Sequence, residues 1–422
     1  MATTTTDATG FEDFRNYDFS NFYFGAGDDV YETINAFQKW WSHAYPGAFH
    51  IYREPLTSAP GTLISINTNL GEEQHGLLNF SSYNYLGMAN SEVVKRAAIQ
   101  AIEQYGLGAS GGPILSGMFE IHRQLERSLA AFKKKEACIT FNSGYAANLG
   151  IISGLMRSGD TIFIDQFSHA SIIDGAILSK AKTIFFRHNN ASDLERKIKD
   201  IPGRKLVIVE GIYSMDGDFC QLPEIIAVSK KYGARIMIDE AHSGFICGEN
   251  GRGIVEHFGL EEAVDFQMGT FSKALGGIGG YVCGDAAFIE YIEAYGRSRF
   301  FSCTLPPAVT AGVLASLEYV IAHPEIRKTL WSNVAHLQSR LLAEGIDIGH
   351  STSPVMPIMV YDDNKVFDVA KALRVRGIFL QPVNYPAVSK GKARLRLSVS
   401  SEHTIDQLDF VAQNLSEVLK SQ

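Results

Sequence analysis

Short apolar segments alternate with helical segments along most of this 422-residue chain. From about residue 90 onward, apolar runs of four or five residues are separated by stretches with helical spacing, such as 193–199 and 221–232. Strands that are apolar on both faces and joined by helices form parallel sheets with helices on each side. We therefore predict an α/β large domain with a mostly parallel sheet between helices, whose strands are 137–141, 161–164, 183–186, 206–209, 236–239, 266–269 and 280–283.

The segments on either side of this region have a different character. Residues 11–60 are rich in aromatic side chains, and their helical spacing over 29–44 indicates an arm that packs on the body or on a partner subunit. A cap over a substrate or a membrane is the functional alternative. The C-terminal part predicts a smaller α+β domain with helical stretches at 308–345 and 365–376 and strands near 355–361 and 394–399. We expect three parts, namely an N-terminal segment (1–75), a large domain (76–304) and a small domain (305–422).

Composition excludes several classes of protein. The chain has no run of about 18 apolar residues, so we expect no transmembrane segment. Residues 1–10 (MATTTTDATG) lack the basic start and apolar stretch of a secretory signal, and they predict a disordered tip. The five cysteines are scattered without a CxxC pair, which argues against a metal site or a disulfide framework and favours the cytoplasm. A net charge of −8 with dispersed basic residues argues against a nucleic-acid partner.

Polar residues follow five of the predicted strands. Ligands of parallel sheets bind at the carboxyl ends of the strands, so these residues are candidates for one common site. The strand-end groups are Asn142–Gly144, Asp165–His169, Glu210, Asp239–His242 and Thr270–Lys273.

The most informative of these groups surrounds Lys273, in the stretch GTFSKALGGIGG. Taken locally, this lysine fits a solvated turn. The alternative is a buried amine that forms a Schiff base with an aldehyde cofactor. The glycine spacing matches neither a dinucleotide fingerprint nor a P-loop. The role of Asp239 also has two interpretations, because this residue could cap the next helix or keep the nitrogen of a pyridine cofactor protonated.

Eight motifs in order resemble the pyridoxal-phosphate enzymes of fold type I and, more narrowly, the α-oxoamine synthases. The resemblance covers roughly residues 75–415. The matching segments are SYNYLG (82–87), NSGYAAN (142–148), SHAS (168–171), EGIYSMDGD (210–218), DEAH (239–242), GTFSK (269–273), TLPP (304–307) and RLRLS (394–398).

The resemblance implies the roles of the residues around the ring of pyridoxal 5'-phosphate. Lys273 forms the Schiff base with the cofactor and later moves the α-proton of the substrate. Asp239 pairs with the pyridinium nitrogen, and His169 stacks on the ring. His242 and Ser214 address the phenolic oxygen.

The resemblance also implies a phosphate site and a substrate site. Gly144, Tyr145, Thr270 and Ser272 hold the phosphate, and Ser302 reaches the phosphate of a partner subunit across a homodimer. Of the substrate residues, Arg396 binds the carboxylate of the amino acid and Asn84 lies nearby.

The implied reaction is the decarboxylative condensation of an amino acid with an acyl thioester. The aromatic N-terminal segment and EGIYSMDGD are closest to the serine palmitoyltransferase branch, which joins L-serine to a long-chain acyl-CoA and yields 3-ketosphinganine, CO2 and a free thiol. Gly111–Ile114 departs from the serine-type pattern. L-alanine or glycine as the amino acid, as in 8-amino-7-oxononanoate synthase or 2-amino-3-ketobutyrate CoA ligase, therefore stays open, and so does a carrier-protein thioester.

Two further hypotheses belong to other classes. A non-catalytic partner subunit is disfavoured by the presence of Lys273, Asp239 and His169. An aminotransferase is disfavoured by His169 and the SYNYLG motif. For location we expect the cytoplasm, with the inner membrane as a possible peripheral surface.

Overall fold

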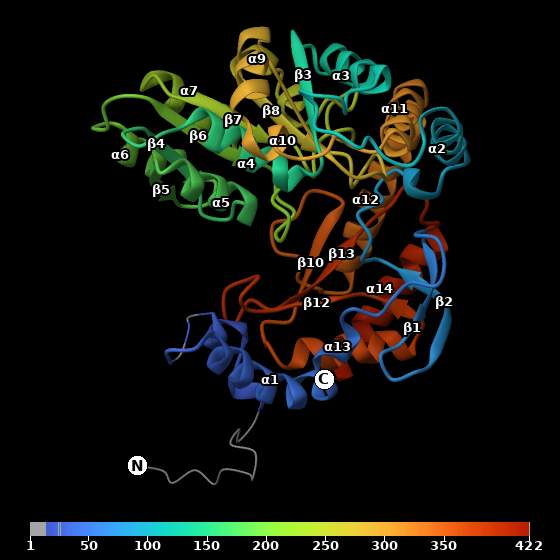
Figure 1. Cartoon of the computed structure of the whole chain (residues 1–422). Helices are drawn as coiled ribbons and strands as arrows, with labels where there is room; N and C mark the ends of the chain where they lie inside the picture. The colour runs from blue at the N-terminus through green and yellow to red at the C-terminus, as the bar shows by residue number, and fades with distance from the viewer. Residues whose placement is uncertain (1–13, 24, 26, 422) are drawn as a thin grey trace.

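The computed structural model describes residues 14–23, 25 and 27–421. In Figure 1 one region is built on a broad sheet, and a second region brings the first and last described segments of the chain together. Residues 1–13, Phe24 and Ala26 lie outside the described residues, and so does the predicted polar tip at 1–10. Within the described part, no helix is long and apolar enough to cross a lipid bilayer.

The broad sheet has seven strands, and all of them except β9 run in the same direction. The predicted mostly parallel sheet is therefore confirmed, with each predicted strand at its expected place. In spatial order the strands are β3 (Ala137–Phe141), β9 (Gly280–Gly284), β8 (Phe266–Thr270), β7 (Arg235–Asp239), β6 (Lys205–Glu210), β4 (Thr161–Asp165) and β5 (Lys182–Phe186).

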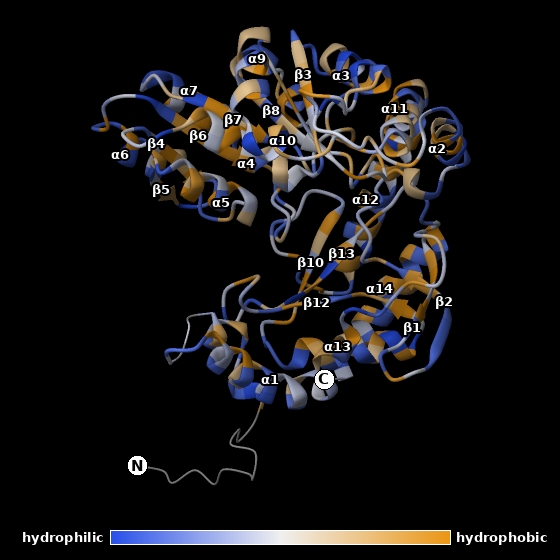
Figure 2. Ribbon diagram, viewed as in Figure 1, coloured by the Kyte–Doolittle hydropathy of each residue, from blue (hydrophilic) through white to orange (hydrophobic). Residues whose placement is uncertain are grey.

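Both faces of the central strands are buried, which explains why these strands are mostly apolar on both sides (Figure 2). Along β4, Ile162 and Ile164 join one core cluster, whereas Phe163 joins the cluster on the other face. One face is covered by α4 (Gly144–Leu155), α5 (Ala170–Ser179) and α9 (Ala286–Tyr295), next to the short α10 (Arg297–Phe300). The other face is covered by α6 (Ala191–Ile198), α7 (Leu222–Lys231), α8 (Ile254–His257) and, over β3 and β9, α3 (Glu120–Lys133).

The predicted helical region at 308–345 is two helices. The first, α11 (Pro307–Ala322), ends at His323, and α12 (Pro324–Ala343) begins with a proline. Proline has no N–H and disfavours helical geometry at the residue before it, so it starts a new helix here. α11 packs along α2 (Glu92–Tyr105) and also contacts α3.

The second region holds two small sheets. The sheet β10-β13-β12 combines β10 (Val355–Met359), β13 (Arg394–Ser398) and β12 (Pro382–Val383). The other combines β1 (Leu63–Asn67), β2 (Glu73–Asn79) and β11 (Ile378–Phe379), so an early hairpin pairs with a late strand. The helices α13 (Lys365–Val375) and α14 (Ile405–Ser421) complete this region. The domain boundaries at 75 and 304 stay predictions.

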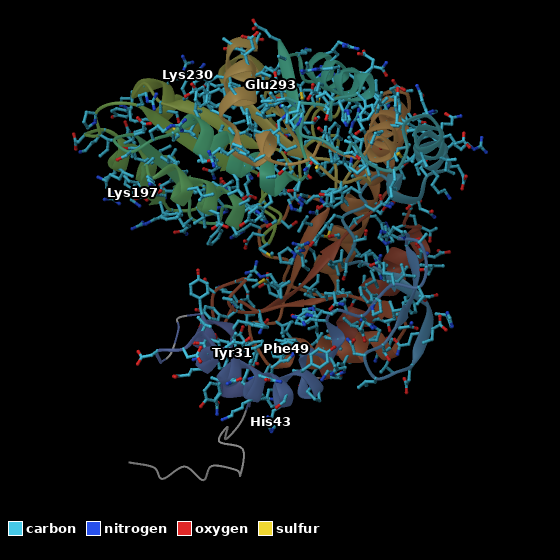
Figure 3. The ribbon with its side chains drawn as sticks, viewed as in Figure 1. Tyr31, His43, Phe49, Lys197, Lys230 and Glu293 are labelled. Carbon is cyan, nitrogen blue, oxygen red and sulfur yellow. The ribbon has the colours of Figure 1, made fainter. Side chains whose placement is uncertain are left out.

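The aromatic arm packs against the second region. Its main helix, α1 (Val30–Gly47), lies beside α13 in Figure 1, between short 3-10 helices at Phe14–Asn16, Phe19–Phe22 and Phe49–Ile51. Trp40 is fully buried, and its indole N–H donates to the carbonyl of Phe14 at 2.9 Å. Phe49, labelled in Figure 3, meets Phe367 of α13 with 4.9 Å between ring centroids.

Candidate active site

The carboxyl ends of neighbouring strands place polar residues at one edge of the broad sheet. Glu210 of β6 and Asp239 of β7 are register partners, and Thr270 ends β8 on the other side of β7. Asp165 ends β4, which pairs with β6. The convergence that the strand ends predicted therefore occurs, because parallel strands end at the same edge.

Asp239 is held in one orientation by two donors. It is only 4 % exposed. Its Oδ1 accepts the N–H of Ala241 at 2.8 Å, and its Oδ2 accepts the side-chain amide of Asn148 at 2.9 Å. The remaining lone pairs of the carboxylate therefore point in fixed directions, which suits it to accept a hydrogen bond from a protonated ring nitrogen.

Asn148 also connects Asp239 with His169. The same amide nitrogen donates to the hydroxyl oxygen of Ser171 at 2.9 Å, and that oxygen lies 2.8 Å from Nδ1 of His169. The Ser171 N–H points to Nδ1 as well, at 3.3 Å. Burial lowers the pKa of His169 more than the charge of Asp239 raises it, so the ring is neutral with its proton on Nε2.

The backbone of His169 is tied to Glu210, whose carboxylate accepts the His169 N–H. Glu210 is 4 % exposed. Burial raises the pKa of Glu210 well above its ordinary value, and the neighbouring charge of Asp239 adds to that effect. Glu210 thus holds the backbone at the start of α5, from which the ring of His169 projects.

His242 meets Tyr85 rather than a charged group. The hydroxyl of Tyr85 lies 2.8 Å from Nδ1 of His242, and both side chains are buried. Burial lowers the pKa of His242 well below its ordinary value, and the positive charge of Lys273 lowers it further. The imidazole is therefore neutral at physiological pH.

Lys273 is a partly buried amine close to the carboxylates of Asp239 and Glu210. Burial lowers its pKa, although the charges of Asp239 and Glu210 act in the opposite direction. Its Nζ lies 6.0 Å from the ring centroid of Tyr83. The loop after it carries Gly276 at φ 68°, where a Cβ would lie 2.2 Å from the backbone nitrogen of Ala89. This glycine lets the SYNYLG segment pack against the lysine loop.

The start of α4 forms a cradle that suits an anion. A Cβ on Gly280 would lie 2.6 Å from the carbonyl oxygen of Ser143 and 2.8 Å from the nitrogen of Gly144, so only glycine allows this approach. Thr270 Oγ1 donates to the carbonyl of Gly279 at 2.7 Å and lies 2.9 Å from Ser272 Oγ. Because the proton of Thr270 Oγ1 goes to Gly279, Ser272 Oγ donates to Thr270 and keeps its lone pairs free. The N–H groups of Gly144 and Tyr145 at the start of α4 are the donors that suit a phosphate.

Tyr145 stands at this helix start, but its side chain turns elsewhere. Its hydroxyl donates to Asp174, and the side chain is largely exposed. Its ring stands edge-on to His169, with 6.1 Å between centroids. A phosphate role for Tyr145 therefore belongs to its backbone N–H.

Arg396 is a guanidinium with no carboxylate partner in the described residues. Its contacts among the described residues include the face of Tyr83, 4.3 Å from the guanidinium carbon to the ring centroid, the carbonyl of Ser214 at 3.4 Å and the sulfur of Met215 at 3.9 Å. Burial lowers the pKa of Arg396 to about 10. The predicted residue Ser214 thus meets Arg396 through its backbone, and the arginine is ready for an incoming carboxylate.

The remaining predicted residues are Asn84 and Ser302. The side-chain oxygen of Asn84 accepts the N–H of Ala89 at 3.1 Å, whereas its buried Nδ2 has no hydrogen-bond partner within the described chain. The Nδ2 amide group is therefore a buried, unsatisfied hydrogen-bond donor within the described chain. Ser302 is half-buried between α10 and α11, against the backbone of Gly112. Its contact across a dimer stays a prediction.

Sequence reasoning did not assign roles to five residues that the fold brings into the site. All five lie in or beside the recognised motifs, which is the signal that could have marked them. They are Tyr83, Tyr85, Asn148, Ser171 and Glu210.

A pocket of about 550 Å³ adjoins Arg396 and Tyr83. Its walls come from the SYNYLG segment, from the segment 381–387, from Met215 and from the N-terminal part of the chain. Phe19 and Tyr52 are the two residues of that N-terminal part. The lining is mostly apolar, so the pocket suits a hydrophobic group beside the guanidinium of Arg396.

The residues present fit pyridoxal phosphate. The cradle at Gly144 and Gly280 suits its phosphate, Asp239 suits its ring nitrogen, and the neutral His242 suits its phenolic oxygen. Lys273, with its lowered pKa, suits the aldehyde.

The chain resembles known proteins along most of its length. Residues 75–415 match the model of the family "Aminotransferase class I and II". An 8-amino-7-oxononanoate synthase of Petrotoga mobilis is 41 % identical over 370 residues, which cover 87 % of this chain and 93 % of the relative. A serine palmitoyltransferase of Sphingobacterium spiritivorum is 40 % identical over 373 residues, which cover 88 % and 92 %.

Solved structures agree with this similarity. The serine palmitoyltransferase of Sphingomonas wittichii superposes with a TM-score of 0.88 at 32 % identity and covers 94 % of this chain and 99 % of that one. A high-resolution structure of SPT with a PLP internal aldimine gives the same TM-score and coverage at 33 % identity. The predicted fold is thereby confirmed.

Proposed function

Because the chain belongs to the aminotransferase class I and II family and, within it, to the α-oxoamine synthases, we propose that it condenses L-serine with a long-chain acyl thioester. The predicted enzyme class and cofactor, pyridoxal 5'-phosphate, are those of its relatives. The choice of substrates is the proposal. The observation that carries it is the unpaired guanidinium of Arg396, which lies between the lysine site and an apolar pocket.

The cofactor, when bound, supplies an aldehyde that joins the amino group of the substrate and a ring that takes up electrons from the α-carbon. Arg396 binds the carboxylate of the amino acid through its two parallel N–H groups. The ring of Tyr83 lies 4.3 Å from the guanidinium carbon and limits the positions that the guanidinium can take. This geometry orients the bonds of the α-carbon, which is the main task of the protein in such a reaction.

Lys273 takes the α-proton at Nζ. The amine must be unprotonated to do so, and burial favours that form by lowering its pKa. A carbon–carbon bond then forms between the α-carbon and the acyl carbon, while the carbon–sulfur bond breaks and the thiolate leaves and takes a proton from solvent. The bond to the carboxylate breaks next and leaves its electron pair on the α-carbon, to which Lys273 Nζ returns the proton it took. The products are an α-amino ketone, CO2 and the thiol.

The apolar pocket supports a long acyl group. Its volume of about 550 Å³ exceeds what the side chain of serine or alanine needs, and Phe19, Tyr52 and Met215 line it. The serine palmitoyltransferase relative and the solved neighbours of that name support serine. The relative named 8-amino-7-oxononanoate synthase supports L-alanine as the second candidate to a similar degree. Glycine and a carrier-protein donor remain further outcomes of the test.

The test uses the visible absorbance of the purified holoenzyme during titration with L-serine, L-alanine and glycine. We expect a saturable change of the cofactor band at the lowest concentration with L-serine, and an α-amino ketone by mass spectrometry after palmitoyl-CoA is added. A response to L-alanine alone would replace serine by the second candidate. Holoenzyme that responds to none of the three would contradict the proposed reaction.

A homodimer is part of the proposal, because Ser302 is expected to act across subunits. Large apolar side chains near Ser302 and on the adjoining loops are exposed, which suits a partner subunit. They include Leu107, Ile114, Leu115, Ile278 and Phe301. Light scattering should give twice the monomer mass of 46.4 kDa, whereas a monomeric active enzyme would contradict the role of Ser302. Cytoplasmic location and contact with a membrane surface stay predictions.

A further inference from the structure

The hydroxyl of Tyr85 has one hydrogen-bond partner among the described residues, the imidazole of His242. The oxygen lies 2.8 Å from Nδ1. Tyr85 is 1 % exposed and His242 is 6 % exposed, so water does not compete for this contact. The bond connects the segment before α2 with the loop after β7.

The direction of this hydrogen bond follows from the inventory of donors. A buried phenol that fails to donate its proton leaves an unsatisfied donor, which costs on the order of 1–3 kcal/mol. If Nδ1–H donated to the tyrosine oxygen, the phenol proton would have no acceptor within the described part of the chain. Tyr85 therefore donates and Nδ1 accepts.

Both partners are neutral, which makes the tautomer well defined. Burial raises the pKa of Tyr85 and lowers that of His242. A neutral imidazole whose Nδ1 accepts a hydrogen bond carries its proton on Nε2. No residue of the described chain occupies Nε2, so this N–H is available to a ligand beside Lys273.

We propose that Tyr85 is a positioning residue that holds His242 as the Nε2–H tautomer, so that His242 donates a hydrogen bond to the phenolic oxygen of pyridoxal phosphate. The opposite tautomer would present a lone pair to that electron-rich oxygen and repel it. The inference concerns the cofactor site and is independent of which amino acid or acyl thioester reacts.

The two tyrosines of SYNYLG therefore have separate tasks. Tyr83 is 37 % exposed and uses its ring, which lies 4.3 Å below Arg396. Tyr85 uses its hydroxyl, out of contact with solvent. Tyr281 offers a matched control for Tyr85, because it is fully buried and its hydroxyl makes no hydrogen bond to any described residue.

The first test records ring nitrogen shifts of full-length holoenzyme labelled with 15N-histidine, with the His242 signals assigned from His242→Gln. In the wild type and in Tyr281→Phe we expect a protonated Nε2 and a hydrogen-bonded, unprotonated Nδ1. In Tyr85→Phe the Nδ1 signal should move toward a free lone pair or toward a mixture of tautomers. A protonated Nδ1 in the wild type overturns the proposal, and this spectrum decides even if Tyr85→Phe does not fold.

The second test measures the dissociation constant of pyridoxal phosphate by fluorescence titration of stripped protein. Loss of one oriented hydrogen bond should weaken binding about three- to tenfold in Tyr85→Phe, with no change in Tyr281→Phe. Equal affinities in Tyr85→Phe and the wild type, or equal weakening in both variants, would overturn the proposal.

Discussion

At the scale of single residues, two partly buried basic side chains, Lys273 and Arg396, carry the proposed mechanism. Replacing Lys273 by alanine removes the amine that takes the α-proton, so we expect turnover to fall below detection while pyridoxal phosphate still binds noncovalently. Borohydride reduction followed by mass spectrometry should show covalent cofactor in the wild type and none in Lys273→Ala. Lys230→Ala, on the outer surface in Figure 3, should keep both properties. Normal turnover by Lys273→Ala would falsify the mechanism.

A substitution of Arg396 tests the proposed binding of the substrate carboxylate, also at the scale of one residue. A lysine keeps the charge but loses the fork that binds a carboxylate through two bonds. We expect Arg396→Lys to raise the KM for the amino acid roughly tenfold or more, since a hydrogen bond to a charged group is worth about 1.5–3 kcal/mol. The affinity for pyridoxal phosphate should stay the same. An unchanged KM for the amino acid would show that Arg396 does not bind its carboxylate.

At the scale of elements, the close approach of β9 to the start of α4 shapes the anion cradle. Gly280→Ala places a methyl group 2.6 Å from the Ser143 carbonyl oxygen, so β9 and α4 must separate. We expect pyridoxal phosphate to bind roughly tenfold more weakly, which corresponds to ~1.4 kcal/mol. Gly108→Ala is the matched control, because a Cβ there meets nothing within 4 Å. Equal affinities of the two variants would show that the cradle does not depend on this contact.

A second interaction between elements is made by His188, which joins Asp165 at the end of β4 to Asp218 in the loop after β6. Its ring nitrogens lie 3.0 Å from Asp165 and 2.8 Å from Asp218. Burial alone lowers the pKa of His188, but the two carboxylates outweigh it and raise the pKa to about 10. The unfolded value is about 6.5. Its stabilisation is therefore complete below pH 6.5 and is lost as the pH rises through about 10.

We expect His188→Gln to lower the free energy of unfolding by about 3 kcal/mol at pH 6, with a deficit that shrinks toward pH 10. Urea unfolding at pH 6, 8 and 10 measures it. His323→Gln, an exposed histidine, should behave like the wild type. A deficit that stays constant across this range would mean that packing, rather than charge, explains the role of His188.

At the scale of the whole molecule, the N-terminal arm lines the pocket beside Arg396 in which we propose that the acyl chain binds. Phe19 lines that pocket, whereas Phe22 packs on Phe37 and Trp40 without lining it. We expect Phe19→Ala to raise the KM for a long-chain acyl donor several-fold more than for a short one, because the apolar wall is lost. Phe22→Ala should affect both donors alike. Identical kinetics of Phe19→Ala and the wild type would show that the arm does not contribute to the specificity for the acyl donor.

The alternation of elements and the catalytic edge were predictable because they depend on local patterns. A strand buried on both faces must be apolar at every position, and its polar successor must lie at the carboxyl edge. Lys273, Asp239 and His169 were singled out in this way, whereas Arg396, which lies on the antiparallel strand β13, was suggested only by the family motif. The roles of all four residues stay predictions. The break between α11 and α12 at His323 has a local signal in Pro324. The continuous apolar pattern of 308–345 nevertheless led to the prediction of one helical region.

The tertiary structure alone decided how these residues are coupled. Asn148 meets Asp239 across 91 residues of sequence, and Tyr85 meets His242 across 157. The periodicity of apolar residues carries no information on such pairs. Whether two side chains form a hydrogen bond depends on which atoms the packing of the chain brings within about 3 Å. The sequence by itself determined the parallel sheet, the family and the lysine. Packing decided which tyrosine lies against an arginine, which one meets a histidine, and that an N-terminal phenylalanine lines the pocket.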